Sequence, residues 1–117
     1  MSYPHLFTTP GLGRIAAEID AERARQDAKW GEQNHVDGTG YDGSDSHADF
    51  WRKRCERAFA EGEGTWGHVL LEEAFEAIAE SDPAALRAEL VQVAAVACAW
   101  IAAIDRRTTK AAPKETP

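Results

Sequence analysis

The sequence has few of the residues that build disulfide frameworks or zinc sites. Among its 117 residues there are only two cysteines, Cys55 and Cys98, and neither belongs to a CxxC pair. Paired cysteines at short spacing are typical of zinc and redox motifs, so neither kind of site is expected. We expect two reduced thiols in a cytoplasmic protein.

An excess of positive charge is also missing. The formal net charge is −7 at pH 7. Binding to duplex DNA or RNA needs a basic face, so this charge balance argues against a nucleic-acid polymer as a partner. A phosphorylated small molecule is not excluded, because metal ions can supply positive charge locally.

Signal-peptide, membrane-span and nucleotide-loop patterns are absent as well. Residues 1–10 have no basic stretch followed by an apolar one. The longest apolar run, residues 90–104, is shorter than the roughly 20 residues that span a bilayer, so no membrane partner is expected. We expect this run to be buried inside the protein or at a subunit contact. Neither GxxxxGK[ST] nor GxGxxG occurs, which argues against a P-loop or Rossmann site.

What the sequence does contain is helical patterning. Hydrophobic residues make up 44% of the chain, which is long enough to bury a core. Apolar residues recur with a helical period between turn signals, and no strand-like alternation is present. Four helices are therefore predicted, over residues 11–29, 47–60, 65–80 and 83–107.

Turn and cap residues set these boundaries. Thr9 as a cap and Pro10 in the first turn predict the start of the first helix, and Gly31 predicts its end. The Ser-Asp-Pro sequence of residues 81–83 separates the third helix from the fourth. The long connection over residues 31–46 is rich in glycine and aspartate, which is typical of a functional or mobile loop.

One long and two short connections between the helices predict an all-α four-helix bundle. Residues 1–107 are expected to form a single domain, and the polar tail of residues 108–117 is expected to be disordered. The fourth helix has more apolar surface than one small bundle needs. We therefore expect the bundle to be completed by oligomerisation, as a homodimer or a homotetramer.

Acidic side chains gather on one side of the third predicted helix. At about 100° per residue, four glutamates fall within an arc of about 100°. A solvated acidic face is the most common explanation of such a row. The members of the row are Glu72, Glu73, Glu76 and Glu80.

Glu89, at the head of the apolar fourth helix, needs a partner if it is buried. One alternative is an ion pair with an arginine such as Arg87. The other is that Glu89 faces the acids of the third helix across a bound Mg²⁺, which prefers carboxylate oxygens and often shares coordination with substrate phosphates. If Glu89 faces these acids, Mg²⁺ is the expected cofactor, with Mn²⁺ as an alternative.

The spacing of these acids resembles a known signature. Glu73-x-x-Glu76 followed by Glu89-x-x-Gln92 is similar to the ExxE…ExxD signature of the MazG-like all-α nucleoside triphosphate pyrophosphohydrolases, and Glu72 completes its EExxE form. A second segment, RARQDAKWGEQNH, is similar to the RxxQxxKWGxQxH segment of phage and actinobacterial members of that family. The resemblance covers residues from about 14 to 107.

This resemblance implies a Mg²⁺-dependent hydrolase that converts a (d)NTP to a (d)NMP and pyrophosphate. Gln92 stands where the family has aspartate, and a neutral amide removes one negative charge, so weaker metal binding is expected. A non-catalytic nucleotide binder or oligomeric scaffold is therefore the alternative function. The implied metal ligands are Glu72, Glu73, Glu76, Glu89 and Gln92, of which the four glutamates are also the implied catalytic residues.

Residues around the end of the first helix are candidates for substrate binding. Trp30 would stack on a nucleobase, and neighbouring polar groups would read its edge. The alternative is a tryptophan packed under the loop and a solvated Lys29 at the helix end. The candidate substrate-binding residues are Gln26, Lys29, Trp30, Gln33 and His35.

Overall fold

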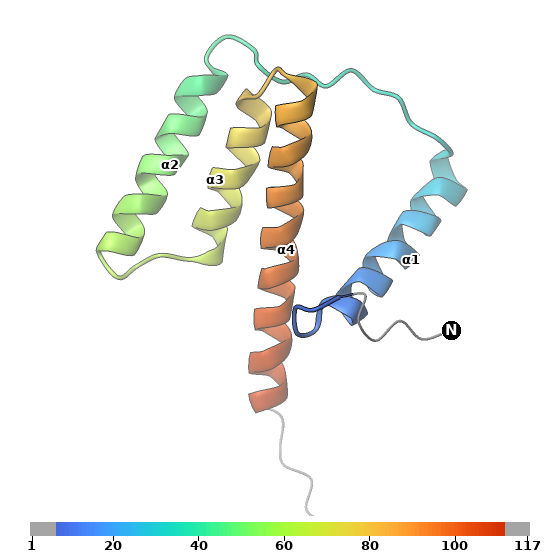
Figure 1. Ribbon diagram of the computed structural model, residues 1–117. Coiled ribbons are helices and arrows are strands. Elements are labelled where there is room, and N and C mark those ends of the chain that lie inside the picture. The colour runs from blue at the N-terminus through green and yellow to red at the C-terminus, as the bar shows by residue number, and fades with distance from the viewer. Residues whose placement is uncertain (1–6, 112–117) are drawn as a thin grey trace, which may run out of the picture. The chain divides into compact units, whose positions relative to one another are not determined.

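The computed structural model describes residues 7–111 and contains four helices and no strand in that range (Figure 1). These helices confirm the predicted all-α class and the number and order of the elements. The chain forms two compact units, of which one holds residues 7–35 and 98–111 and the other holds residues 36–97. The single domain expected over residues 1–107 stays a prediction. The helices are α1 (Leu12–Trp30), α2 (Ser44–Ala60), α3 (Trp66–Ala79) and α4 (Pro83–Ala111).

The start of α1 differs from the prediction because Gly11, and not Thr9, is its N-cap. Gly11 has a φ of 80°, a left-handed conformation that glycine adopts without steric cost. The Leu12 N–H donates to the carbonyl of Thr9 at 3.1 Å, so a turn precedes the helix. Gly31 ends α1 as predicted, and its N–H donates to the carbonyl of Asp27 at 2.8 Å.

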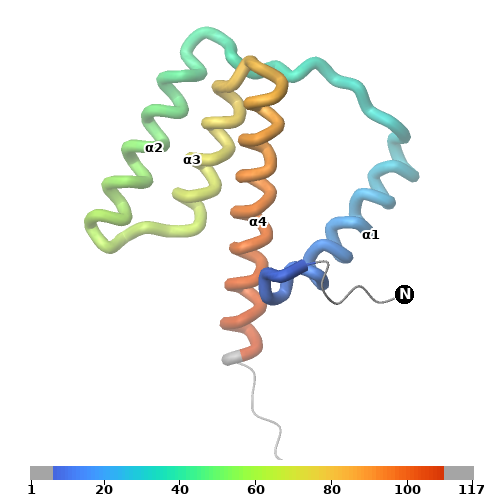
Figure 2. Tube along the Cα trace, viewed as in Figure 1, coloured from blue at the N-terminus to red at the C-terminus, as the bar shows by residue number. Residues whose placement is uncertain are grey.

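The extended connection between α1 and α2 (Figure 2) is tied at its end to α3. The Gly40 N–H donates to the carbonyl of Ile78 at 2.8 Å. Gly40 has a φ of 68°, and a Cβ at this position would lie 2.7 Å from the Cβ of Ser81. Only glycine fits there. The Ser44 N–H donates to the carbonyl of Tyr41, and this turn leads into α2 three residues before the predicted start.

Side-chain caps define the starts of α3 and α4. The Thr65 hydroxyl accepts the N–H of His68 at 3.1 Å, and the His68 Nδ1 accepts the N–H of Thr65 at 3.2 Å. This reciprocal pair is a capping box, which gives His68 a structural role. The Asp82 carboxylate accepts the N–H of Ala85 at 2.9 Å, which confirms the predicted start of α4 at Pro83.

In the unit of residues 36–97, α2 and α3 pack against each other along a seam of mostly small side chains. Small residues let the two backbones approach closely. Beside this seam, the ring of Trp51 stacks on that of Phe75, with centroids 5.9 Å apart and an interplanar angle of 22°. The buried apolar residues of the unit are Ala48, Cys55, Ala58, Ala77 and Leu86.

The other unit joins α1 to the C-terminal half of α4. Ile15 of α1 is its most buried side chain, with 1% of its surface exposed. Arg14 Nη2 lies 3.0 Å from Asp105 Oδ2, and both side chains are well exposed. An exposed ion pair of this kind contributes little free energy, so burial of Ile15 is the larger stabilising term.

The helix α4 is longer than predicted. It continues to Ala111, so residues 108–111 of the expected disordered tail are helical, and residues 112–117 lie outside the described residues. The segment Pro83–Thr109 is long and apolar enough to cross a membrane, and its most apolar 18-residue window has a mean hydropathy of 1.6. The apolar run of residues 90–104 lies between Glu89 and Asp105, and the longer helical segment includes both of these charged residues. Length and composition do not separate such a helix from the core helix of a soluble protein.

The apolar stretch of α4 is only partly covered by the rest of the described chain, and its residues are half-buried or exposed. No residue of its most apolar 18-residue window is buried. The expectation of a helix buried inside this chain is therefore wrong for the described residues. Burial of this stretch at a subunit contact stays a prediction.

Candidate metal centre

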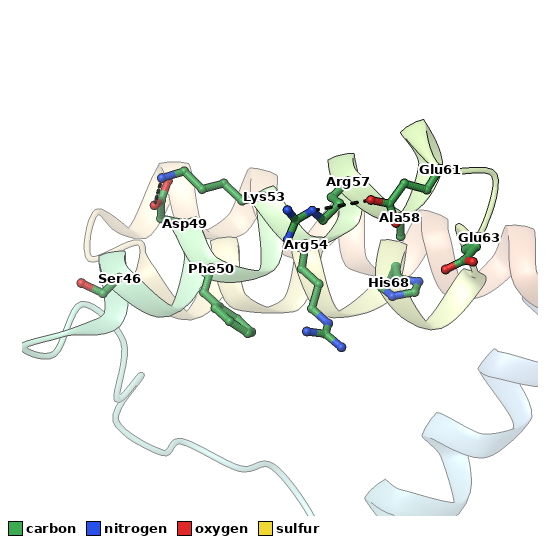
Figure 3. Close-up of a pocket in the computed structure, with 10 residues that line it drawn as sticks. All are labelled: Ser46, Asp49, Phe50, Lys53, Arg54, Arg57, Ala58, Glu61, Glu63 and His68. Atoms are coloured by element: carbon green, nitrogen blue, oxygen red, sulfur yellow. Dashed lines mark ion pairs between the residues drawn. The ribbon is translucent and has the colours of Figure 1, made fainter.

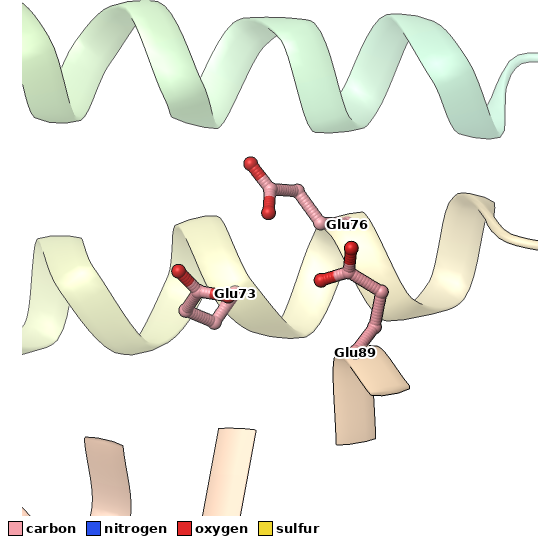
Figure 4. Close-up of side chains that lie close together, drawn as sticks. All are labelled: Glu73, Glu76 and Glu89. Carbon is pink, nitrogen blue, oxygen red and sulfur yellow. The ribbon is translucent and has the colours of Figure 1, made fainter. Parts of the chain in front are cut away.

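Three carboxylates from two helices converge in the unit of residues 36–97. Glu73 and Glu76 of α3 and Glu89 of α4 each offer one oxygen, and these oxygens lie within 4.8 Å of one another (Figure 4). All three side chains are half-buried. Two oxygens on opposite sides of one Mg²⁺ would be about 4.2 Å apart, so small side-chain rotations would close the group around a cation.

Local sequence explains how these residues meet. Glu73 and Glu76 are three positions apart on α3, so their side chains leave the same side of the helix. A short turn at residues 80–82 reverses the chain, and Pro83 starts α4 directly after it. Glu89, in the second turn of α4, is thereby brought back beside α3.

The electrostatics of the cluster favour a bound cation. Burial raises the pKa of Glu73, and the charges of Glu89 and Glu72 raise it further. Burial also raises the pKa of Glu76, and the other glutamates add to the increase while Arg52 opposes it. Carboxylates that are partly buried and close together repel one another, and a divalent cation would remove this repulsion.

Glu72 lies beside α2 and outside the group of three. The Cys55 thiol, 6% exposed on α2, has its pKa raised to about 11, mainly by burial and further by the adjacent Glu72. A thiol with such a pKa is protonated at neutral pH and chemically inert. The proposed role of Glu72 as a metal ligand stays a prediction.

Gln92 follows Glu89 by three residues on α4, and its side chain is exposed. An exposed amide at this position is accessible to a ligand without any loss of packing. Its predicted contact with the metal stays a prediction.

A pocket of about 520 Å³ opens beside the carboxylates, within the range of ligand-binding clefts. It contains Glu76 and Glu89, and α2 contributes the opposite wall, with Arg52 as its only cation. Arg52 Nη2 donates to Asp49 Oδ1 at 2.6 Å, and Lys53 Nζ lies 2.9 Å from Asp49 Oδ2. Hydrogen bonds from these two cations, the one from Lys53 being the stronger effect, lower the pKa of Asp49.

Sequence reasoning missed Asp49 and Arg52 as members of the site. Their spacing of three residues is visible in the sequence as a common helix-surface ion pair. Which side of α2 would face the glutamates could not be deduced from that spacing, because it depends on how α2 packs against α3.

The predicted substrate-binding residues all lie in the other unit. Trp30 is 56% exposed, so it is not packed under the loop, and Lys29 Nζ lies 4.7 Å from the centroid of its ring. Gln26 Oε1 accepts a hydrogen bond from Arg23 Nη1 at 2.7 Å. Gln26 and Gln33 also line one pocket of about 610 Å³ at the end of α1. The substrate-binding role of these residues, and of the exposed His35, stays a prediction.

A larger groove, of about 730 Å³, follows another face of α2 and reaches the start of α3 (Figure 3). Phe50 and Arg54 project from the same side of α2 in this view, and the guanidinium carbon of Arg54 lies 6.0 Å from the Phe50 ring centroid. The cations and the acids of the groove are equal in number, so it has no net charge to attract an ion. Its charged residues are Asp49, Lys53, Arg54, Arg57, Glu61 and Glu63.

The geometry of the carboxylate cluster therefore suggests a chemical function, whereas the neutral groove suggests none. Comparison of the chain with protein-family models, with curated proteins and with solved structures gives no match.

Proposed function

We propose that this protein is a Mg²⁺-dependent nucleoside triphosphate pyrophosphohydrolase. The observation that carries the proposal is the approach of the Glu73, Glu76 and Glu89 oxygens to within 4.8 Å of one another. The same three glutamates carry the resemblance to the MazG-like signature. Oxygen ligands of this kind suit Mg²⁺, which commonly binds nucleotides through their phosphates.

In the proposed reaction, Glu73, Glu76 and Glu89 would hold the metal. When bound, Mg²⁺ supplies positive charge to phosphate oxygens and acidifies a water molecule. Attack of water on the α-phosphorus breaks the α–β anhydride bond and releases a nucleoside monophosphate and pyrophosphate. A carboxylate of the cluster would take the proton of the attacking water.

Two further parts of the proposal come from outside the carboxylate cluster. The exposed ring of Trp30, in the other unit, is proposed as a stacking surface for a nucleobase. A second copy of the chain would cover the apolar side chains exposed along α4, since contiguous exposed apolar surface is typical of subunit contacts. These side chains are Leu90, Val91, Ile101 and Ile104.

The proposal is tested by measuring pyrophosphate release from each of the common dNTPs with Mg²⁺ and with EDTA. We expect release only with Mg²⁺, and a loss of about a hundredfold or more in Glu76→Gln. Glu63→Gln is the control, because it removes an equal charge from an exposed glutamate in the neutral groove. Release that persists in EDTA or in Glu76→Gln would rule out this mechanism.

One observation favours a second candidate function, a nucleotide-binding protein without turnover. Gln92 replaces the aspartate of the signature and is exposed on α4, so the site has one negative charge fewer than the family pattern. Calorimetric titration with a non-hydrolysable dNTP separates the two candidates. Binding of the analogue with no release of pyrophosphate from dNTPs supports the binder.

A further inference from the structure

We infer that Arg52 is a phosphate-binding residue of the candidate metal centre and that Asp49 holds it in position. The inference rests on the proposed function and adds the group that would meet phosphate oxygens away from the metal. Arg52 lies on α2, while the three clustered carboxylates come from α3 and α4. The site would thus be built from three helices.

The position of Arg52 is the first argument. It lines the same pocket as Glu76 and Glu89, and it is the only cation among the residues of that pocket. A triphosphate bound to a metal between the glutamates would extend into this space, since the pocket is of ligand size. Arg52 is the side chain that an extending phosphate would meet.

The hydrogen bonding of Arg52 is the second argument. One of its five N–H groups donates to Asp49, at 2.6 Å. Among the described residues, Asp49 is the only carboxylate within 4.0 Å of the guanidinium, so Arg52 is not an ion-pair partner of Glu76 or Glu89. The donors that remain form a planar array, which matches two oxygens of one phosphate.

The local charge balance is the third argument. The charged lining of the pocket consists of one cation, Arg52, and five carboxylates, Asp45, Asp49, Glu76, Glu80 and Glu89. A polyphosphate entering this pocket would be repelled unless a metal covers the glutamates. Arg52 is the one side chain of the lining whose charge would attract a phosphate.

The test compares binding of two probes, Mg²⁺ alone and Mg²⁺ with inorganic tripolyphosphate, by calorimetry. In Arg52→Gln we expect unchanged or tighter binding of Mg²⁺ and about tenfold weaker binding of Mg²⁺-tripolyphosphate. Arg57→Gln is the matched control, because it removes the same charge from α2 at an exposed position in the neutral groove. It should change neither affinity.

The outcomes separate this inference from the proposed function. Equal tripolyphosphate binding in Arg52→Gln and the wild type would overturn the role of Arg52 alone. Parallel weakening of both probes would make Arg52 a structural residue and would also overturn it. A wild-type protein that binds neither probe would remove the proposed function and this inference together.

A second variant keeps the test informative if Arg52→Gln does not fold. Arg52→Lys keeps the charge but loses the planar donor array, so we expect tripolyphosphate binding between those of the wild type and Arg52→Gln, with Mg²⁺ binding unchanged. Tripolyphosphate binding equal to that of the wild type would contradict the proposed two-oxygen contact.

Discussion

Glu89 of α4 places a carboxylate oxygen within 4.8 Å of one from Glu73 of α3. If both bind one Mg²⁺, the ion stabilises the fold, by about 2.7 kcal/mol when its concentration is a hundred times the Kd. We expect the melting temperature to rise with Mg²⁺ and Glu89→Gln to lose most of that rise. The metal-free variant should be as stable as the wild type or more stable, since one repelling charge is gone. A full Mg²⁺ response in Glu89→Gln would contradict the shared site.

Glu72 and Glu76 are predicted to differ in importance, although both belong to the EExxE form. Glu76→Gln should weaken Mg²⁺ binding by about tenfold or more, and Glu72→Gln by less, because Glu72 lies beside Cys55. Loss of the Glu72 charge should also lower the pKa of Cys55 and speed its alkylation, which mass spectrometry can follow. Equal Mg²⁺ affinities in the two variants would make Glu72 a full ligand.

The pH dependence of stability should reveal the clustered carboxylates. A carboxyl whose folded pKa is raised destabilises the fold when it is ionised in both states, and this cost disappears as the pH falls through the raised pKa. The pKa values of Glu73 and Glu76 are both raised above the ordinary value of 4.5. The metal-free protein should therefore gain stability as the pH falls from about 7 toward these raised pKa values, and the stabilisation by Mg²⁺ should shrink because protons compete with it.

Melting temperatures at several pH values, with and without Mg²⁺, measure both effects. The double variant Glu73→Gln and Glu76→Gln is the control, and most of the slope of the metal-free protein should vanish in it. A Mg²⁺ effect that grows on acidification would be inconsistent with carboxylate ligands.

Gln92→Asp should increase Mg²⁺ affinity. The substitution restores the carboxylate of the signature one helical turn after Glu89, and the exposed position tolerates a new charge. We expect tighter Mg²⁺ binding by calorimetry and faster pyrophosphate release. Thr108→Asp is a suitable control, since it adds the same charge at an exposed position of α4 outside its apolar stretch. Equal gains in both variants would indicate a nonspecific effect of charge.

Gly40→Ala should destabilise the protein more than Gly38→Ala. Both glycines have a positive φ, of 68° and 70°, so both substitutions introduce backbone strain of about 1 kcal/mol. Only at Gly40 would the new Cβ also meet Ser81, at 2.7 Å, whereas nothing lies within 4 Å at Gly38. Chemical denaturation of the two variants isolates the cost of the clash. Equal losses would mean that the contact between the loop and Ser81 is absent in solution.

The sequence predicts most of the local structure because its signals act over a few residues. Gly31 ends α1 and Asp82 caps α4 through their own backbone and side-chain groups. Glu73 and Glu76 lie on the same side of α3 because of their spacing of three residues. The start of α2 was predicted too late because the glycine and aspartate residues before it were assigned to one long loop, whereas the turn from Tyr41 to Ser44 already leads into the helix.

Features that depend on packing between helices could not be deduced in this way. The contribution of Asp49 and Arg52 to the pocket follows from the rotation of α2 about its axis, which the seam with α3 sets. The apolar stretch of α4 likewise has no buried residue in its most apolar window. That stretch looks like a core helix in the sequence, because composition does not specify which surfaces are available to cover it.

The hydrogen bond from Gly40 to Ile78 has a consequence for backbone dynamics. Residues 32–39 make no backbone–backbone hydrogen bond, whereas the Gly40 amide is held by the last turn of α3, just beyond Glu76. Its exchange with deuterium should thus be slow within a fast-exchanging segment, and it should follow the opening of the helix end and not the motion of the loop. One amide would thereby report from a distance whether the turn that supports Glu76 is intact.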